Sequence, residues 1–369
     1  MSEAVDAATV AAPDIAVSRE TEPRFQSVAV HETSIDDVSR ETREPETSEG
    51  AGTEPPIARE AASAVRVRTI DKEVWPKPAA TRVMTVANQK GGVGKTTTAV
   101  NVAAALAMHG LEVVVIDLDP QGNASTALGI AHTVGTPSVY DVLLSGRPLD
   151  EIAKPADFAH SLRCAPATLD LAGADIELTS QVAREYRLQR AVNTFLASGS
   201  PPDYILIDCP PSLGLLTLNA LVAAQEVFIP IQCEYYALEG LAQLLNTVEL
   251  VREHLNPNLV VTTVLLTMYD SRTRLADQVA DEVRRHFGPL VLTPVIPRNV
   301  RVSEAPGFGQ TVMTYDAGSR GAIGYLEAAR EMAFRAINPP QAAPIAASDV
   351  VAAPDVTPTH IEEDKESQA

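Results

Sequence analysis

The sequence predicts an α/β fold in which a single doubly wound, mostly parallel sheet is covered by helices on both faces. Between residues 81 and 337, short runs rich in β-branched residues alternate with segments of helical periodicity. Several of these runs are apolar almost throughout, as expected for parallel strands buried on both faces. A glycine-rich loop also separates the first run from the first helical segment. In such folds ligands bind at the carboxyl ends of the strands.

The elements are expected in the following order. The predicted strands are RVMTVAN (82–88), EVVVIDLD (112–119), SLRCAPA (161–167), YILIDCP (204–210), EVFIPIQ (226–232), VVTTVLLTMY (260–269) and VLTPVI (291–296). The predicted helices between and after them include 95–109, 182–197, 215–224, 238–254, 274–287 and 320–336.

The two ends of the chain differ in composition from this central domain. Residues 1–80 and 338–369 are acidic and lack a sustained apolar period, so we expect both to be disordered tails. They are either solvated linkers or docking arms. The segment VRVRTIDKEVW (65–75) is a candidate binding segment, and a polar or division protein is a candidate partner of the N-terminal tail.

Charge and cysteine content restrict the function classes further. The net charge of −19 in 369 residues argues against a general nucleic-acid binder, so any DNA contact requires a local basic patch. The widely spaced Cys164, Cys209 and Cys233 are typical of reduced core thiols. No signal peptide is recognisable, and the apolar runs are about half the ~20 residues that a membrane helix needs. We therefore expect a cytoplasmic protein that does not enter a membrane.

The loop QKGGVGK resembles a phosphate-binding loop of the P-loop NTPase type, with one departure. The usual pattern G-x-x-x-x-G-K-[ST] requires glycine at position 89, where this chain has Gln89, and an extra lysine stands at Lys90. Glycines let the backbone turn tightly and direct its N–H groups at phosphate oxygens, where a helix N-terminus adds partial positive charge. Lys95 is expected to reach the β- and γ-phosphates, and the Thr96 hydroxyl to hold Mg²⁺. The alternative is a glycine-rich loop that binds nothing.

Acidic residues at two strand ends complete the predicted site. Asp208 closes a hydrophobic run, and we assign it to the metal ion, through water. Asp119 is assigned to the attacking water, whereas Asp117 is expected to support loop geometry. The alternative for Asp119 and Asp208 is that they cap turns or helices.

The extra lysine, Lys90, lies at the rim of the predicted loop and is poorly placed to duplicate Lys95. A second cation that arrives from outside a site can accelerate phosphoryl transfer by about 10³–10⁵. We therefore expect Lys90 to reach a nucleotide held by a second copy of the chain. The alternative is a solvated loop lysine.

Taken together, these motifs resemble the ParA/MinD family of ATPases with a deviant Walker A motif, specifically its chromosomal ParA (Soj) branch. The resemblance covers about residues 83–336 and does not extend into either tail. It is carried by KGGVGKTTT, DLDPQGNAS, LAGADIEL, IDCPPSLGLLTLNAL, PIQCEYYALEGLAQLLNT, MYDSRTRLADQV and VIPRNVRVSEAPGFG.

The resemblance implies an Mg²⁺-dependent ATPase that forms an ATP-sandwich homodimer, binds double-stranded DNA without sequence preference, and is released when a ParB-type centromere-binding protein stimulates hydrolysis. Such a protein would be associated with the nucleoid. It implies that Lys90 is the signature lysine, Asp119 the catalytic aspartate, and Arg272 and Arg301 DNA-binding residues. These two arginines lie among several in the last third of the domain. The nucleotide-contacting residues it implies are Lys90, Gly91, Gly92, Val93, Gly94, Lys95, Thr96, Thr97 and Pro297.

Three alternatives stay open: a plasmid partition ATPase, a MinD-like ATPase that positions proteins, and a nucleotide-gated scaffold that recruits partners through its tails. Members of the MinD branch carry a C-terminal amphipathic membrane helix. Here the last residues are acidic and interrupted by proline, which is unsuited to an anionic membrane, so we expect no membrane targeting by that route.

Overall fold

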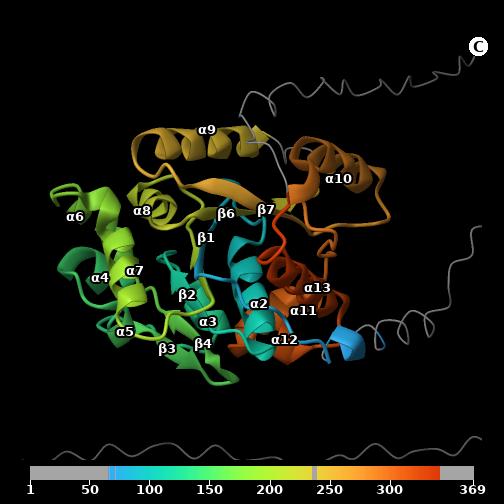
Figure 1. Cartoon of the computed structure of the whole chain (residues 1–369), viewed down its shortest axis with the longest axis horizontal. Helices are drawn as coiled ribbons and strands as arrows, with labels where there is room; N and C mark the ends of the chain where they lie inside the picture. The colour runs from blue at the N-terminus through green and yellow to red at the C-terminus, as the bar shows by residue number, and fades with distance from the viewer. Residues whose placement is uncertain (1–64, 66, 71, 235–238, 341–369) are drawn as a thin grey trace, which may run out of the picture. The chain divides into compact units, whose positions relative to one another are not determined.

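The computed structural model describes residues 65, 67–70, 72–234 and 239–340 of the chain, which all fall in the same structural unit (Figure 1). The two expected tails therefore lie mostly outside the described residues. Within these residues, no helix is long and apolar enough to cross a membrane.

A seven-stranded sheet forms the centre of this unit, in the order β3-β4-β2-β5-β1-β6-β7. All neighbouring strands are parallel except β3 and β4, which are antiparallel. The expectation of a doubly wound, mostly parallel sheet is confirmed. The strands are β1 (Arg82–Val86), β2 (Val113–Asp117), β3 (Lys154–Ala156), β4 (Ala159–Ala165), β5 (Tyr204–Asp208), β6 (Glu226–Gln232) and β7 (Val260–Thr267).

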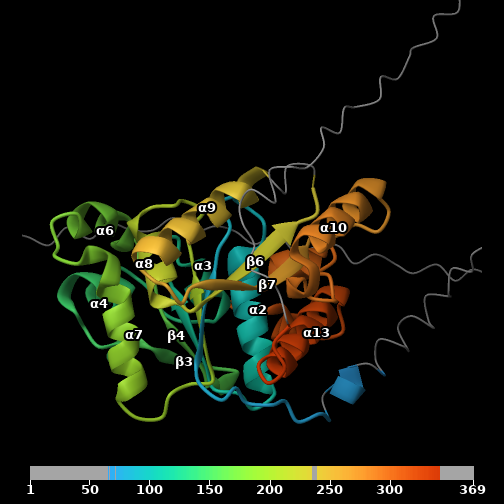
Figure 2. The same ribbon diagram turned by 45° about the horizontal axis from the view of Figure 1, so that its top comes forward.

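Helices cover both faces of the sheet because successive side chains of a strand point to opposite faces. In β5, for example, Ile205 and Ile207 join one core cluster, whereas Tyr204 and Leu206 join the other. One face packs against α2 (Lys95–Met108), α3 (Asn123–Ala127), α12 (Val312–Tyr315) and α13 (Arg320–Arg335). The other packs against α4 (Val139–Ser145), α5 (Leu149–Ile152), α6 (Leu171–Leu178), α7 (Arg187–Ala197), α8 (Leu215–Ala223), α9 (Glu239–His254) and α10 (Arg274–Phe287). Figure 2 shows α2 and α13 side by side, as in Figure 1.

The last expected strand, 291–296, is not a continuous strand. Val291 forms only an isolated parallel bridge with Val264, and Leu292 and Ile296 donate single backbone hydrogen bonds to the carbonyls of Val264 and Leu266. Pro294 lies between these contacts and has no N–H to continue a ladder. The sequence reading also did not identify β3 or the short helices α3 to α6, α11 (Val300–Glu304) and α12.

The folded domain begins before residue 81, earlier than expected. The buried ring of Trp75 stacks on His109 at the end of α2, with ring centroids 3.9 Å apart. Glu73 pairs with Arg330 of α13, and Lys77 pairs with Asp203 at 2.9 Å. The inner end of the predicted N-terminal tail is thus part of the domain.

Candidate functional site

The glycine-rich loop 87–94 joins β1, a central strand of the sheet, to the buried helix α2. Gly92 and Gly94 adopt the left-handed region, with φ of 76° and 89°, which an L side chain rarely adopts. A Cβ built on either glycine would meet nothing within 4 Å, so the space beside the loop is open. The Thr267 hydroxyl at the end of β7 donates to the carbonyl of Val93 at 2.8 Å and fixes the loop to the sheet.

Lys95, the first residue of α2, is a buried cation beneath this loop. Its ammonium donates one long hydrogen bond, 3.4 Å, to the carbonyl of Lys90. Burial lowers the pKa of Lys95, while the negative charges of Asp208 and Asp119 act in the opposite direction. A cation with so little local compensation is suited to an anionic ligand in the open space beside the loop.

Asp117 ends β2 directly beside Asp208 at the end of β5, since the two are paired in register. The buried Asp117 carboxylate accepts hydrogen bonds from the backbone and hydroxyl of Ser125 at 2.9 and 2.7 Å, and from the backbone of Asp119 at 3.2 Å. Burial raises its pKa to about 6, against these hydrogen bonds. Asp117 therefore fixes the turn that follows β2, as the sequence indicated.

Asp208 has no such partners. Both of its carboxylate oxygens are buried and accept no hydrogen bond from any described residue. Burial, and next the charge of Asp117, raise the pKa of Asp208 well above its ordinary value; the nearby Thr96 hydroxyl and Lys95 ammonium lower it, although neither is hydrogen-bonded to it. A buried unpaired carboxylate is costly, and a cation or a water bound to a cation would compensate it.

The remaining predicted residues of the loop region lie close to this pair. Thr96 and Thr97 are half-buried in the first turn of α2. The half-buried Asp119 accepts a hydrogen bond from the backbone of Gln121 at 3.0 Å, and its charge acts on both Lys95 and Asp208. The fold thus brings the P-loop, Asp119 and Asp208 together at the carboxyl ends of β1, β2 and β5.

Lys90 lies at the rim of the loop and forms an ion pair with Glu234, just beyond β6, at 3.2 Å. Glu234 also accepts hydrogen bonds from Gln232 at 2.5 Å and from Arg298 at 3.3 Å. The sequence reading missed Glu234, although it is a third carboxylate that follows a buried strand. A surface ion pair of this kind is weak, so Lys90 is held only loosely at Glu234.

Pro297 and the two predicted DNA-binding arginines belong to the neighbouring 269–301 region. Pro297 forms a parallel bridge with Tyr269. The Arg272 side chain is 84% exposed and pairs with Asp270 at 2.7 Å, and this contact lowers the pKa of Asp270 to about 2. Arg301 pairs with Glu304 at 3.1 Å and Asp316 at 3.5 Å.

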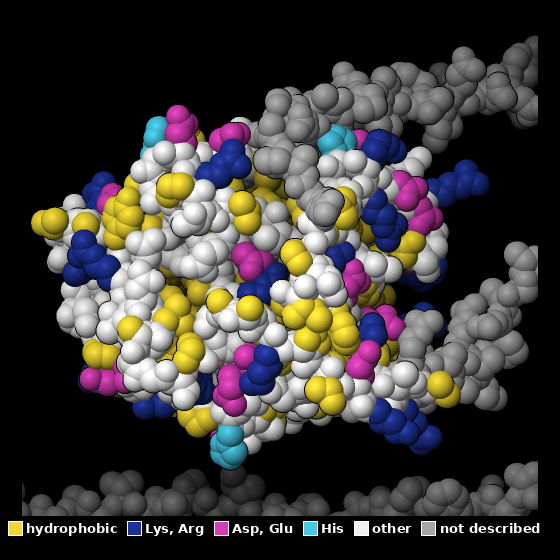
Figure 3. Space-filling view, viewed as in Figure 1, with side chains coloured by type: hydrophobic (Ala, Val, Ile, Leu, Met, Phe, Trp, Pro, Cys, Tyr) yellow, Lys and Arg dark blue, Asp and Glu magenta, His cyan; other side chains and the backbone are white. Residues whose placement is uncertain are grey.

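The predicted basic patch is therefore interleaved with acids. Figure 3 shows dark blue and magenta side chains alternating over α10. Arg284 and Arg285 on this helix pair with Asp281 and Glu282, and the exposed Arg274 forms no ion pair with the described residues. Among those residues, no group of three His, Cys, Asp or Glu side chains is placed to hold a metal ion by itself.

Comparison with known proteins connects this site to a family. A family model described as an AAA domain matches residues 81–261. The chromosome partitioning protein ParA of Caulobacter vibrioides is 53% identical over 254 residues, which are 69% of this chain and 94% of that protein. The sporulation initiation inhibitor protein Soj of Bacillus subtilis is 53% identical over 252 residues, 68% of this chain and 98% of that protein.

A similar solved structure is that of a Mycobacterium smegmatis protein named cobyrinic acid a,c-diamide synthase, crystallised with a bound ATP analogue and magnesium. It is 39% identical, with a TM-score of 0.60, and the match covers 72% of this chain and 99% of that one. From its fold, its phosphate loop and these relatives, the chain belongs to the ParA/Soj family of chromosome-partitioning ATPases.

Proposed function

We propose that this chain is an ATP-dependent dimerising switch for chromosome partitioning, whose ATP-bound dimer binds DNA and is released when a ParB-type partner stimulates hydrolysis. The observation that carries this proposal is the buried, unpartnered Asp208 carboxylate beside the buried Lys95 ammonium, beneath an open glycine loop. Each feature is unfavourable alone, and Mg²⁺ with a triphosphate would compensate both.

The residues present fit ATP and Mg²⁺. The loop 90–97 would hold the phosphates through backbone N–H groups and Lys95, and Pro297 would contact the nucleotide from the neighbouring loop. Thr96 and Asp208 would hold Mg²⁺, Asp208 through water. This donor set is small because Mg²⁺ bound with nucleotides usually keeps several waters and takes only one or two protein carboxylates. Bound Mg²⁺ would neutralise charge that develops on the transferred phosphoryl group.

The chain's own residues then divide the work of hydrolysis. Asp119 is less buried than Asp117 or Asp208, and it would orient and deprotonate the attacking water. Lys95 would hold the transferred group. Asp117, held by Ser125 and by the Asp119 backbone, would keep Asp119 in position.

Lys90 would complete the site across a homodimer. In the single chain its ammonium is paired with Glu234, so it has to leave that carboxylate to reach a nucleotide. Because a surface ion pair contributes at most about 1 kcal/mol, a phosphate of the nucleotide bound by a second chain would compete successfully for Lys90. One chain would thus bind ATP, and its partner would complete the ATP site with Lys90.

DNA binding would use Arg272 and Arg301 and contact phosphates, not base edges. Their acid partners Asp270, Glu304 and Asp316 leave little net charge on one chain. Dimerisation would place two such patches on one surface, and the gain from neutralising more phosphates together makes binding steeply dependent on salt. In this proposal the protein acts in the cytoplasm, on the nucleoid.

Substitution of Arg301 tests this DNA surface. Arg301→Glu is expected to weaken ATP-dependent binding to random duplex DNA strongly and to reduce its salt slope by about one for each chain of the dimer. Arg147→Glu is the matched control, because Arg147 is also an exposed arginine paired with a nearby glutamate, Glu151. Equal binding by both variants and the unmodified chain would reject Arg301 as a DNA contact.

A further inference from the structure

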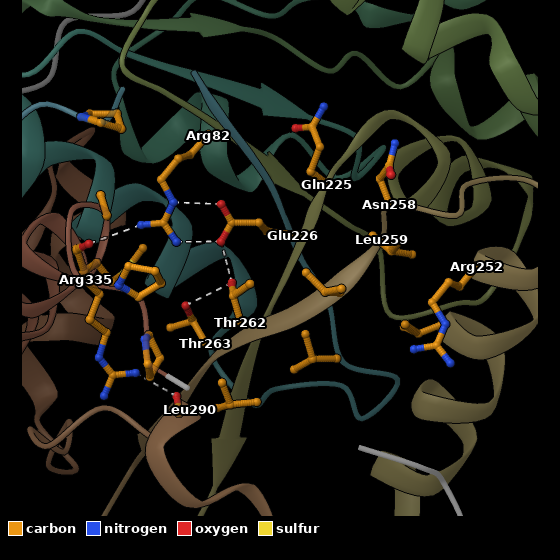
Figure 4. Close-up of a pocket in the computed structure, with 18 of the residues that line it drawn as sticks. Arg82, Gln225, Glu226, Arg252, Asn258, Leu259, Thr262, Thr263, Leu290 and Arg335 are labelled. Carbon is orange, nitrogen blue, oxygen red and sulfur yellow. Dashed lines mark hydrogen bonds and ion pairs between the residues drawn. The ribbon is translucent and has the colours of Figure 1, made fainter. Parts of the chain in front are cut away.

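A pocket of about 570 Å³ lies at the opposite end of the sheet, at the amino ends of β1, β6 and β7 (Figure 4). Its walls come from α9, the 290 region and the end of α13. The nucleotide site does not use it. The pocket is also lined by Pro339 and Pro340, the last residues that the structure describes.

The charged groups in this pocket are already paired. The Arg82 guanidinium donates two hydrogen bonds to the Glu226 carboxylate, at 2.7 and 2.5 Å, and one to the carbonyl of Met332 at 3.2 Å. The Thr262 hydroxyl also donates to Glu226, and Figure 4 shows these three side chains converging. At another wall, Arg335 donates to the carbonyls of Leu290 and Val291. The pocket therefore offers no unpaired buried charge to an ionic ligand.

The part of the pocket that lacks a partner among the described residues is the outer edge of strand β7. β7 is the last strand in the sheet order, and residues 291–296 begin to pair with its outer side only at Val264. Residues 260–263, which line the pocket, have no strand on that side among the described residues. Val260 is 45% exposed at this edge. An edge with free backbone groups is a template for an added strand.

Apolar side chains flank the edge on two sides, next to the ion pair of Glu249 and Arg252 on α9. Leu245 and Val248 of α9 line one side of the pocket, and Leu290 and Met332 line another. An occupant must therefore supply backbone hydrogen-bonding groups and small apolar side chains. That is the chemistry of an extended peptide.

The chain itself continues from this pocket with such a segment. Beyond Pro340, residues 345–353 read IAASDVVAA, nine residues of mostly small or β-branched type between Pro344 and Pro354. No proline interrupts the segment, so each of its residues has an N–H to donate. Its first residue is five positions from Pro340, and five extended residues span roughly 17 Å.

We propose that residues 345–353 of the C-terminal segment add as a strand to the β7 edge at residues 260–263 and cover this pocket. The segment shields an edge that would otherwise pair with other chains. This inference is independent of the nucleotide site and of the proposed function.

Hydrogen exchange tests the proposal directly. The full chain and a chain truncated after Pro340 are compared by mass spectrometry, and amides in 260–263 are expected to exchange about tenfold or more faster after truncation. A synthetic peptide of residues 343–355, added at about millimolar concentration to match a short tether, should restore the protection. The same peptide with Val350→Pro lacks a central donor and should restore less.

A matched pair of variants locates the binding edge. In the truncated chain, Val260→Lys is expected to weaken peptide protection, whereas Leu250→Lys, at a residue of α9 that is 56% exposed and outside the pocket, should leave it unchanged. Equal exchange in the full and truncated chains, with no effect of the peptide, would overturn the proposal. So would protection of the edge in the truncated chain that rises with protein concentration, because a second copy would then be the occupant.

Discussion

The two ends of the β1–β5 strand pair differ in how their charged side chains are paired. At the amino end Arg82 is paired in register with Tyr204, and its guanidinium is matched by the Glu226 carboxylate. At the carboxyl end Val86 is paired in register with Asp208, whose buried carboxylate has no hydrogen-bond partner among the described residues. One end satisfies its charges internally, and the other leaves a charge for a ligand.

This difference separates stability from function. Charges that are matched within the chain contribute to the fold, so removing one partner leaves the other buried and costly. A charge that the fold leaves unmatched lowers stability, and a bound ligand of opposite charge would compensate it. Substitutions at the amino end should therefore lower the free energy of unfolding and leave ATP hydrolysis intact. Substitutions at the carboxyl end should reduce ATP hydrolysis while the chain stays folded.

The largest effects are expected at the carboxyl end, on the rate of hydrolysis. Lys90→Ala and Asp119→Ala should each reduce ATP hydrolysis by about 10³ or more while the chain stays folded. An equal mixture of the two should regain roughly a quarter of the unmodified rate, because half of the dimers are mixed and one of their two sites has both groups. Steady-state phosphate release measures this, with dimer mixing checked by tagged chains. An inactive mixture that contains mixed dimers would show that Lys90 does not act across the dimer.

At the amino end the expected loss is in stability. Arg82→Ala should lower the free energy of unfolding by about 3 kcal/mol, because Glu226 and the Met332 carbonyl lose their partner, and activity per folded molecule should be retained. Urea unfolding followed by circular dichroism gives the value. The double variant Arg82→Met, Glu226→Leu should recover most of the loss. An Arg82→Ala chain as stable as the unmodified one would mean that this pair does not support the fold.

A smaller effect concerns pH. The pKa values of Asp208 and Asp117 are raised in the folded chain, Asp117 to about 6. Above the ordinary aspartate pKa of 3.8, the folded state therefore holds more protons than the unfolded state. In the absence of nucleotide, the free energy of unfolding should fall by about 1–3 kcal/mol as pH rises from about 4 to 7. Asp208→Asn should make this fall shallower, whereas Asp281→Asn, at a side chain of α10 that is 71% exposed, should not. An identical slope in both variants and the unmodified chain would exclude Asp208 as its source.

The smallest effect is expected from the pair that holds Lys90. Glu234→Gln removes an exposed ion pair worth less than about 1 kcal/mol and should raise basal hydrolysis a few-fold at most. Glu151→Gln, which removes the partner of Arg147 elsewhere on the surface, is the control and should have no effect. A lower rate in Glu234→Gln would assign Glu234 a positive part in hydrolysis.

The sequence predicted most of what local patterns specify. The six main strands, α2, and the convergence of the phosphate loop with Asp119 and Asp208 follow from apolar periodicity, glycine positions and the rule that parallel strands end at one edge. The expectation that Asp117 supports the loop agrees with the hydrogen bonds that it accepts from Ser125 and Asp119.

What the sequence could not supply depends on contacts between distant segments. The composition around Trp75 is that of a tail, and the residue that Trp75 packs against, His109, comes only after the phosphate loop in the sequence. Glu234 was missed because its role depends on Lys90, 144 positions earlier. The arginine positions predict a basic patch, but the sequence does not show that Asp270 lies beside Arg272, or that Glu304 and Asp316 lie beside Arg301.

The central claim is that a ligand at the carboxyl end switches the chain between a free and a DNA-bound state. The most direct measurement is binding to random duplex DNA with ATP, with ADP and without nucleotide, at two salt concentrations. Our account predicts binding with ATP alone, weakened steeply at the higher salt. Binding that is absent, or equal in all three nucleotide states, would contradict it.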